Sequence, residues 1–179
     1  MEPTAVALWV IVLLVVLAFG LAQGIKTYVA QPFIVPTGSM IPTIELRNYL
    51  LAEKITYRFQ RKPQYKDIVV FNNPTHDPAA PILIKRLIAT GGQVVNLKDG
   101  AVYVDGKKLD EPYTYGKPSY PLNPNIRYPF TVPADSYWMM GDNRTNSGDS
   151  REFGAVPASA VIGHAVWTYW PVSKFGQLK

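Results

Sequence analysis

The sequence predicts an all-β, mostly antiparallel domain preceded by one N-terminal transmembrane helix, for three reasons. The chain begins with a long apolar run that carries no charged side chain between Glu2 and Lys26. The remainder consists of short, β-branched apolar runs separated by turn-forming residues, which is typical of strands joined by turns. After Ile25 no segment repeats its apolar residues with a sustained helical period, so long helices are not expected there.

The composition excludes several classes of site. The 179 residues include no cysteine, which excludes a disulfide framework, a thiol nucleophile and a thiolate metal site. With only two histidines a polyhistidine metal centre is not expected, and the sequence predicts no metal and no other cofactor. The net charge of +5 is too small an excess to indicate a nucleic-acid partner.

The segment Ala5–Ile25 is the predicted membrane anchor. Its 21 residues span about 31 Å as an α-helix, close to the roughly 30 Å hydrocarbon core of a bilayer. The alternative is a cleaved signal peptide ending near Gly20-Leu21-Ala22, but no Lys or Arg precedes the run, and the run exceeds the usual length of about 7–15 residues. We therefore expect an anchor over 1–25 and a domain over 26–179. Charge does not orient the anchor, because the α-amino group and Lys26 balance across it.

Six later runs are predicted strands, and two Asp-Gly pairs are predicted hairpin turns. The strands are expected at 67–71, 82–89, 93–97, 101–104, 136–140 and 161–170, and the turns at 99–100 and 105–106. Six prolines fall between Pro112 and Pro133 among several tyrosines, and each proline removes a donor from a β-ladder. The stretch over about 105–133 is therefore expected to form an inserted flap.

A serine follows the anchor in a stiff turn. Pro36 and Pro42 bracket Gly38-Ser39-Met40, which suits a nucleophile that needs an exposed hydroxyl and a free backbone N–H for an oxyanion. The G-x-S-x-G pattern fails at Ile41, and the S-x-x-K pattern fails at Pro42. By itself such a turn more often has a purely structural role.

Two adjacent cations, Lys85 and Arg86, interrupt the apolar strand predicted at 82–89. Alternation places Leu83 and Leu87 with Lys85 on one face, so both faces of the strand are apolar. Burial lowers the pKa of a lysine and makes it a usable general base, whereas a buried arginine needs a carboxylate partner. An edge strand with both cations reaching water is the alternative that the strand pattern leaves open.

The segment Gly141–Gly154 is a polar loop rich in Asp, Asn, Ser and Gly, which favour turns. A calcium loop is rejected, because Arg144, Ser147 and Phe153 occupy positions that require an acid, a glycine and a glutamate. The loop does supply carboxylates that could pair with Arg86 and hydroxyls that could hold an amine.

In this order, behind one N-terminal span, these three segments resemble the bacterial type I signal peptidases, and the resemblance covers nearly the whole chain. Its motifs are Gly38-Ser39-Met40-x-Pro42-Thr43, the Lys85-Arg86 pair, and the polar run from Gly141 to Arg151. The resemblance implies a signal-peptidase-type β-fold and a membrane-bound serine endopeptidase with a Ser–Lys dyad. Ser39 would be the nucleophile and Lys85 the general base, with the Thr37 hydroxyl and the Ser39 N–H binding the oxyanion.

The resemblance also implies supporting roles in the polar loop. Ser147 would orient the amine of the base, Asp149 and Arg151 would form an ion pair that braces the loop, and Asp142 would pair with Arg86.

Further implications concern the substrate and the location. Apolar residues would line shallow pockets that accept alanine at the −1 and −3 positions of a signal peptide: Phe33, Val35, Pro36, Met40, Ile44 and Ile84. The implied partners are preprotein signal peptides and membrane lipid, with the secretion translocon as a further candidate and no nucleic acid. The domain would face the extracytoplasmic side of the cytoplasmic membrane.

Three alternatives stay open at this point. A self-cleaving Ser–Lys protein like the SOS-response repressors would share the fold and the dyad. Those repressors, however, carry a DNA-binding domain where this chain has a membrane span. A non-enzymatic, membrane-anchored β-domain could bind a partner through the flap. A Ser–His–Asp hydrolase would have to use His76 or His164, and neither lies in a matching motif.

Overall fold

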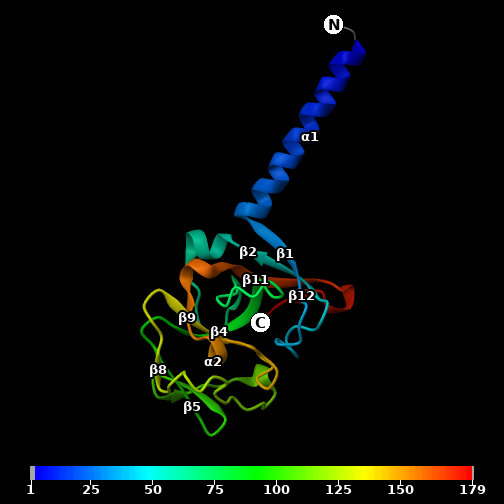
Figure 1. The fold of residues 1–179 in the computed structure, drawn as a ribbon. Coiled ribbons are helices and arrows are strands. Elements are labelled where there is room, and N and C mark those ends of the chain that lie inside the picture. Colours follow the sequence, from blue (N-terminus) through cyan, green and yellow to red (C-terminus); the bar gives the residue numbers. More distant parts are fainter. Residues whose placement is uncertain (1–2, 179) are drawn as a thin grey trace.

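The computed structural model describes residues 3–178, which form one long helix and two antiparallel sheets. Helix α1 (Pro3–Tyr28) extends away from the sheets, and its far end carries the N-terminus (Figure 1). Its segment Ala7–Tyr28 has a mean hydropathy of 2.6, and none of its apolar window is buried inside the described chain, so by length and composition it could cross a membrane. The run without charge predicted for the anchor lies inside this helix.

The larger sheet has eight strands, which pair antiparallel throughout. Seven of them follow the order β1-β2-β11-β3-β4-β9-β10, and β12 pairs with β11. Their bounds are β1 Ala30–Ile34, β2 Tyr49–Glu53, β3 Ile68–Asn72, β4 Ile82–Thr90, β9 Ser136–Met140, β10 Val156–Pro157, β11 Val161–Trp170 and β12 Gly176–Gln177. Strand β4, which carries Lys85 and Arg86, is therefore central, between β3 and β9.

The smaller sheet lies at the end of the molecule away from α1 (Figure 1). Its order is β7-β6-β5-β8, with β5 Val94–Lys98, β6 Ala101–Val104, β7 Lys107–Lys108 and β8 Phe130–Thr131. Among the described residues between β7 and β8 there is no strand, because the prolines there cannot donate to a ladder. Both Asp-Gly pairs have positive φ at both residues, as a type I′ hairpin turn requires.

The predicted all-β, mostly antiparallel class is confirmed, and all six predicted strands are present within one residue at each end. The other six strands of the described chain were not predicted: β1, β2 and the two-residue strands β7, β8, β10 and β12. Pro32 interrupts β1, which tolerates it because it is an edge strand, and the short run in β2 does not stand out between polar neighbours.

After Tyr28 the described residues form only short helical segments, as the sequence predicts. They are the π-helical turn η1 (Thr56–Gln60), α2 (Ser150–Phe153), and the 3₁₀ turns η2 (Pro112–Thr114), η3 (Ala158–Ala160) and η4 (Val172–Lys174).

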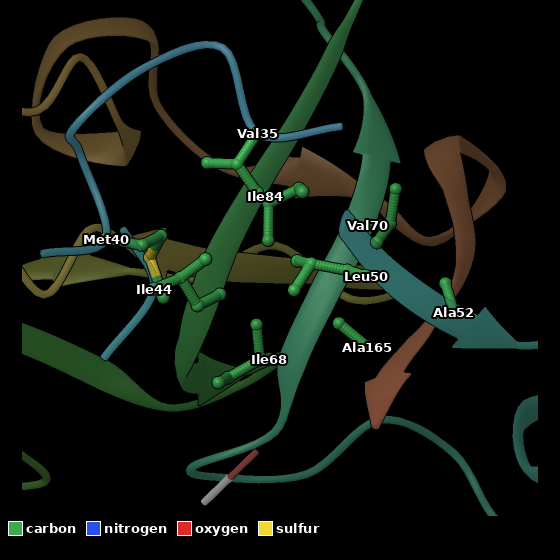
Figure 2. Packing of buried hydrophobic residues seen from close by; sticks show 9 residues of the cluster. All are labelled: Val35, Met40, Ile44, Leu50, Ala52, Ile68, Val70, Ile84 and Ala165. Atoms are coloured by element: carbon green, nitrogen blue, oxygen red, sulfur yellow. The ribbon is translucent and has the colours of Figure 1, made fainter. Parts of the chain in front are cut away.

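One hydrophobic cluster fastens the serine segment to the larger sheet. Val35, Met40 and Ile44 flank Ser39, and their side chains are buried against strands β2, β3, β4 and β11. Figure 2 shows these side chains converging with those of the strands. Burial of three apolar side chains within ten residues, at about 1.5–3 kcal/mol each, holds this loop in one place. The hydroxyl of Ser39 is thus carried on a loop that is part of the core.

Candidate active site

Ser39 lies in a turn that two local hydrogen bonds close. The N–H of Ile41 donates to the Gly38 carbonyl at 3.2 Å, and the N–H of Ile44 donates to the Met40 carbonyl at 2.9 Å. Ser39 itself is 8% exposed. The side chains on either side of it are anchored in the core, so the hydroxyl faces β4 instead of open solvent.

Lys85 is buried in the centre of β4, and its Nζ donates to Ser39 Oγ at 2.5 Å. Only 2% of Lys85 is exposed, so the edge-strand alternative with a solvated amine is wrong. Desolvation lowers the pKa of Lys85 to about 8, although the charge of Asp149 acts in the opposite direction. At that pKa about one lysine in ten is neutral at pH 7, compared with about one in 2,500 for an exposed lysine.

Two potential oxyanion donors lie beside the pair. Thr37 Oγ1 is 3.3 Å from Ser39 Oγ. Among the described residues, no acceptor takes the Ser39 N–H. A carbonyl oxygen placed near both groups could accept from the Ser39 N–H without a competing acceptor, and from the Thr37 hydroxyl if that hydroxyl turns away from Ser39 Oγ.

The polar loop docks directly on the serine turn through Gly141 and Asn143. The N–H of Asn143 donates to the Ser39 carbonyl at 3.0 Å, and its Nδ2 donates to the Gly38 carbonyl at 2.9 Å. A Cβ at Gly141 would lie 2.5 Å from the Ser39 carbonyl oxygen and would overlap Ser147. The close approach of loop and turn therefore requires glycine at this position.

Arg86 and Asp142 form a buried ion pair next to the Ser39–Lys85 pair. The Arg86 guanidinium donates twice to the Asp142 carboxylate, at 2.8 and 2.6 Å, and the Thr43 hydroxyl donates to the same carboxylate at 2.5 Å. The ring of Tyr113, from the predicted flap, stacks on the guanidinium at 4.1 Å. A buried arginine is thereby supplied with the carboxylate that it needs.

Asp149 is the centre of the second half of the loop. Its carboxylate accepts hydrogen bonds from the Arg151 guanidinium at 2.9 and 2.8 Å, from the Gly141 N–H at 3.0 Å, and from the Ser147 hydroxyl at 2.8 Å. It also caps α2 by accepting from the Arg151 N–H. Within the described residues the Ser147 hydroxyl thus donates to Asp149, and its role in orienting the Lys85 amine stays a prediction.

The structure adds ties between the flap and the site that the sequence did not reveal. Lys117 Nζ donates to Asn143 Oδ1 at 2.6 Å. The buried Arg144 forms an ion pair with Glu111 at 2.5 Å and donates to Ser119. No periodicity or motif connects a flap residue with the loop, so these contacts could not be read from the pattern.

Two cavities adjoin the Ser39–Lys85 pair. One of about 330 Å³ has a mixed lining, with polar side chains from Asn73, Asp77, Asn146 and Glu152 in its wall beside apolar ones. The other, of about 240 Å³, is predominantly apolar and contains no carboxylate. Its wall includes five of the six residues predicted to bind substrate: Phe33, Val35, Pro36, Met40 and Ile84. The sixth, Ile44, does not line it, because its side chain is fully buried in the core beneath the serine turn.

The two histidines lie outside this arrangement. His76 is an exposed residue in the loop before β4, and His164 in β11 stacks on Tyr57, with Glu53 and Asp67 within 4 Å. In the described chain the partners of the Ser39 hydroxyl are Lys85 and Thr37. A Ser–His–Asp triad is therefore not formed. No group of three or more described His, Asp or Glu residues is arranged to hold a metal ion.

Comparison with known proteins agrees with the motifs. Residues 8–170 match the family model described as signal peptidase, peptidase S26. The signal peptidase I of Leptolyngbya laminosa is 40% identical, with 88% of this chain and 77% of that protein covered. Probable signal peptidase I-2 of Synechocystis sp. is 43% identical, with 88% and 71% covered. A solved structure of a signal peptidase I from Enterococcus faecalis is 32% identical, covers 58% of this chain and 97% of that one, and has a TM-score of 0.46.

Proposed function

The chain belongs to the signal peptidase family, peptidase S26, and we propose that it removes N-terminal signal peptides from translocated preproteins with a Ser39–Lys85 dyad. Membership of the family supports the removal of signal peptides by a serine peptidase. The observation that carries the dyad is the 2.5 Å separation of Lys85 Nζ from Ser39 Oγ in a buried setting.

The proton transfers follow from this geometry. The neutral Lys85 amine accepts the proton of the Ser39 hydroxyl while Oγ bonds to the scissile carbonyl carbon. The ammonium then protonates the departing amine as the C–N bond breaks, which leaves an ester on Ser39. Lys85 next accepts a proton from the water that attacks this ester, and it returns the proton to Ser39 Oγ as the ester bond breaks.

The oxyanion of each tetrahedral intermediate is held by the Ser39 N–H and the Thr37 hydroxyl. Both residues line the two cavities beside the dyad, where a scissile carbonyl would enter. Loss of one such donor typically costs about 2.7–4 kcal/mol of transition-state stabilisation.

The polar loop acts as a brace in this proposal. The Asp149–Arg151 pair and the Ser147 hydroxyl hold the loop against Gly141, and Asp149 contributes a negative charge that favours the Lys85 ammonium after the first transfer. Asp142 pairs with Arg86, and its charge also favours the Lys85 ammonium, whereas the charge of Arg151 opposes it.

Specificity for small residues follows from the apolar cavity. Five residues of its wall come from β1, from the loop that carries Ser39 and from β4: Phe33, Val35, Pro36, Met40 and Ile84. Three of them, Val35, Met40 and Ile84, are buried and fixed in the core. A cavity of about 240 Å³ that also has to admit peptide backbone leaves room for alanine at −1 and −3. The lack of a carboxylate in its wall gives no preference for a basic residue.

Residues 1–25 anchor the protein in the cytoplasmic membrane, with 26–179 as the extracytoplasmic domain and 105–133 as its flap. Support comes from the apolar α1 and from exposed aromatic side chains on β11 and the turn after it: Trp167, Tyr169, Trp170 and Phe175. Such side chains suit the interface of a bilayer. At that interface the domain would encounter signal peptides and the translocon.

Cleavage of a preprotein with an Ala-x-Ala site tests the proposal. We expect Ser39→Ala and Lys85→Ala to lower kcat/KM at least about 10³-fold, while Lys107→Ala, at an exposed lysine of β7, keeps wild-type activity. Leucine in place of alanine at −1 should lower cleavage about 5- to 150-fold, because it overfills the cavity. Full activity of Ser39→Ala would refute the dyad. Cleavage of the chain itself without cleavage of the preprotein would favour the self-cleaving alternative.

A further inference from the structure

A cluster of three cations surrounds the point where α1 joins the sheet. Lys26 lies in the last turn of the helix, and Lys54 follows β2. Lys54 Nζ donates to the Lys26 carbonyl at 2.9 Å and to Gln31 Oε1 at 3.0 Å. Arg58, in the π-helical turn η1, lies over the ring of Tyr28 at 5.1 Å. We call Lys26, Lys54 and Arg58 the junction cluster.

The positive charge of this cluster is not balanced by protein carboxylates. Among the described residues, none of the three cations forms an ion pair with Asp or Glu. Lys54 does neutralise the carbonyl end of α1, which is a favourable place for one cation. Desolvation, followed by the charges of Arg58 and Lys26, lowers the pKa of Lys54. The three cations therefore repel one another, and a bound anion would relieve that repulsion.

The position of the cluster along α1 sets its depth in a bilayer. The apolar part of the helix ends at Ile25, so the residues just beyond it lie at the level of the lipid headgroups. Turn η1 lies next to this end of α1, visible as the teal coil beside its base in Figure 1. The N–H of Lys54 also donates to the Val29 carbonyl at 2.8 Å, which ties the turn to the end of the helix.

Turn η1 also presents an apolar tip. Phe59 is 78% exposed, and no residue of the turn is itself buried. Exposed aromatic and cationic side chains side by side, next to a membrane-spanning helix, match the composition of surfaces that lie in a bilayer interface.

We propose that the junction cluster binds the phosphate of an anionic phospholipid, with Phe59 inserted among the acyl chains beside it. This inference rests on the proposed membrane span of α1. The occupant is lipid because the cluster begins on the last turn of the spanning helix, where headgroup phosphates are the anions within reach. Bound lipid would fix the tilt of the β-domain against α1 and so hold the mouth of the site above the membrane surface.

The lack of cysteine in the chain allows a clean depth measurement. Gln60→Cys, at the exposed end of η1, is labelled with an environment-sensitive fluorophore in the full chain, placed in nanodiscs of phosphatidylcholine or of phosphatidylcholine with about 30% phosphatidylglycerol. Lipids with a quencher near the headgroup report the depth of the probe. We expect quenching to be at least about 2-fold stronger with phosphatidylglycerol, and to lose this increase in about 1 M salt.

Two paired variants identify the cause. Lys54→Gln with Arg58→Gln should abolish the phosphatidylglycerol-dependent increase, whereas Lys107→Gln with Lys108→Gln, two exposed lysines on β7, should keep it. Peptide cleavage by the Lys54/Arg58 variant in phosphatidylcholine shows that it is folded. Equal quenching in both lipids, or loss of the increase in the Lys107/Lys108 variant, would overturn the proposal. Because the probe does not report activity, the same result is expected with Ser39→Ala, which separates this test from that of the peptidase function.

Discussion

The amino nitrogen of Lys85 lies 2.5 Å from the hydroxyl oxygen of Ser39, although 46 positions separate the two residues in the chain. Each residue is held by a different part of the fold. Lys85 is fixed by β4 in the centre of a sheet, and Ser39 by a loop whose flanking side chains lie in the core. The distance is therefore set by packing and not by local sequence.

The pH dependence of cleavage should follow the titration of Lys85. Burial lowers the pKa of Lys85 to about 8, and only the neutral amine can accept the Ser39 proton. We expect kcat/KM to rise about tenfold per pH unit below this value and to level off above it. Lys85→Arg should be inactive at every pH, because guanidinium does not deprotonate in this range. A rate that stays flat between about pH 6 and pH 9 would contradict this role for Lys85.

Removal of the buried amine should stabilise the fold at neutral pH. The folded state holds Lys85 at a pKa of about 8, below the 10.5 of an exposed lysine, so the unfolded state binds the extra proton. This corresponds to about 3 kcal/mol at pH 7, and loss of the hydrogen bond to Ser39 offsets about 1 kcal/mol of it. Lys85→Met should therefore unfold with a free energy about 2 kcal/mol higher than wild type.

The same variant has a defined pH signature in denaturation of the full chain in detergent. Wild-type stability should rise between pH 8 and 10.5 as the unfolded lysine loses its proton, so the gap to Lys85→Met should close over this window. A gap that does not change with pH would mean that packing, not desolvation, sets the stability difference.

The ion pair between Arg86 and Asp142 should be far more sensitive than an exposed pair. Asp142→Ala removes the carboxylate from a fully buried guanidinium, and such changes cost about 3–5 kcal/mol. Glu45 and Lys174 form the matched control, at 2.9 Å but half exposed, where Glu45→Ala should cost less than about 1 kcal/mol. Denaturant unfolding of the two variants measures how much stability each one loses. Equal losses would contradict the prediction that burial makes the Arg86–Asp142 pair more important for stability than an exposed pair.

Asn143 should affect turnover more than substrate binding. Its side chain holds the Gly38 carbonyl, and its N–H holds the Ser39 carbonyl, so it orients the peptide that carries the nucleophile. Asn143→Ala should lower kcat about 5- to 150-fold, with KM nearly unchanged. This range corresponds to the free-energy cost of leaving one buried polar group, here the Gly38 carbonyl, without its hydrogen bond. Lys117→Ala, which removes only the support at Asn143 Oδ1, should have a smaller effect.

Steady-state kinetics of both variants separate these effects. A KM that rises in step with the fall in kcat/KM, at constant kcat, would assign Asn143 to substrate binding instead of positioning.

Local sequence was sufficient for the parts of the molecule that short-range chemistry determines. An uncharged apolar run of bilayer length predicts α1, β-branched runs predict strands such as β4 and β11, and Asp-Gly pairs predict the turns of the smaller sheet. These features depend on side chains that are neighbours in the chain. The family resemblance identified Ser39 and Lys85 from short motifs. The number of residues between these motifs does not indicate how far apart the two side chains lie in the fold.

Tertiary structure alone decided which side chains are buried and which groups meet. The pattern of 82–89 is compatible with an edge or a central strand, and only the pairing of β4 with β3 and β9 removes Lys85 from water and lowers its pKa. Ile44 and Met40 flank the same turn and are both buried in the core, yet only Met40 also lines a cavity. Alternation along a strand specifies a face, but desolvation and contact depend on what other segments pack against that face, and those segments lie far away in the sequence.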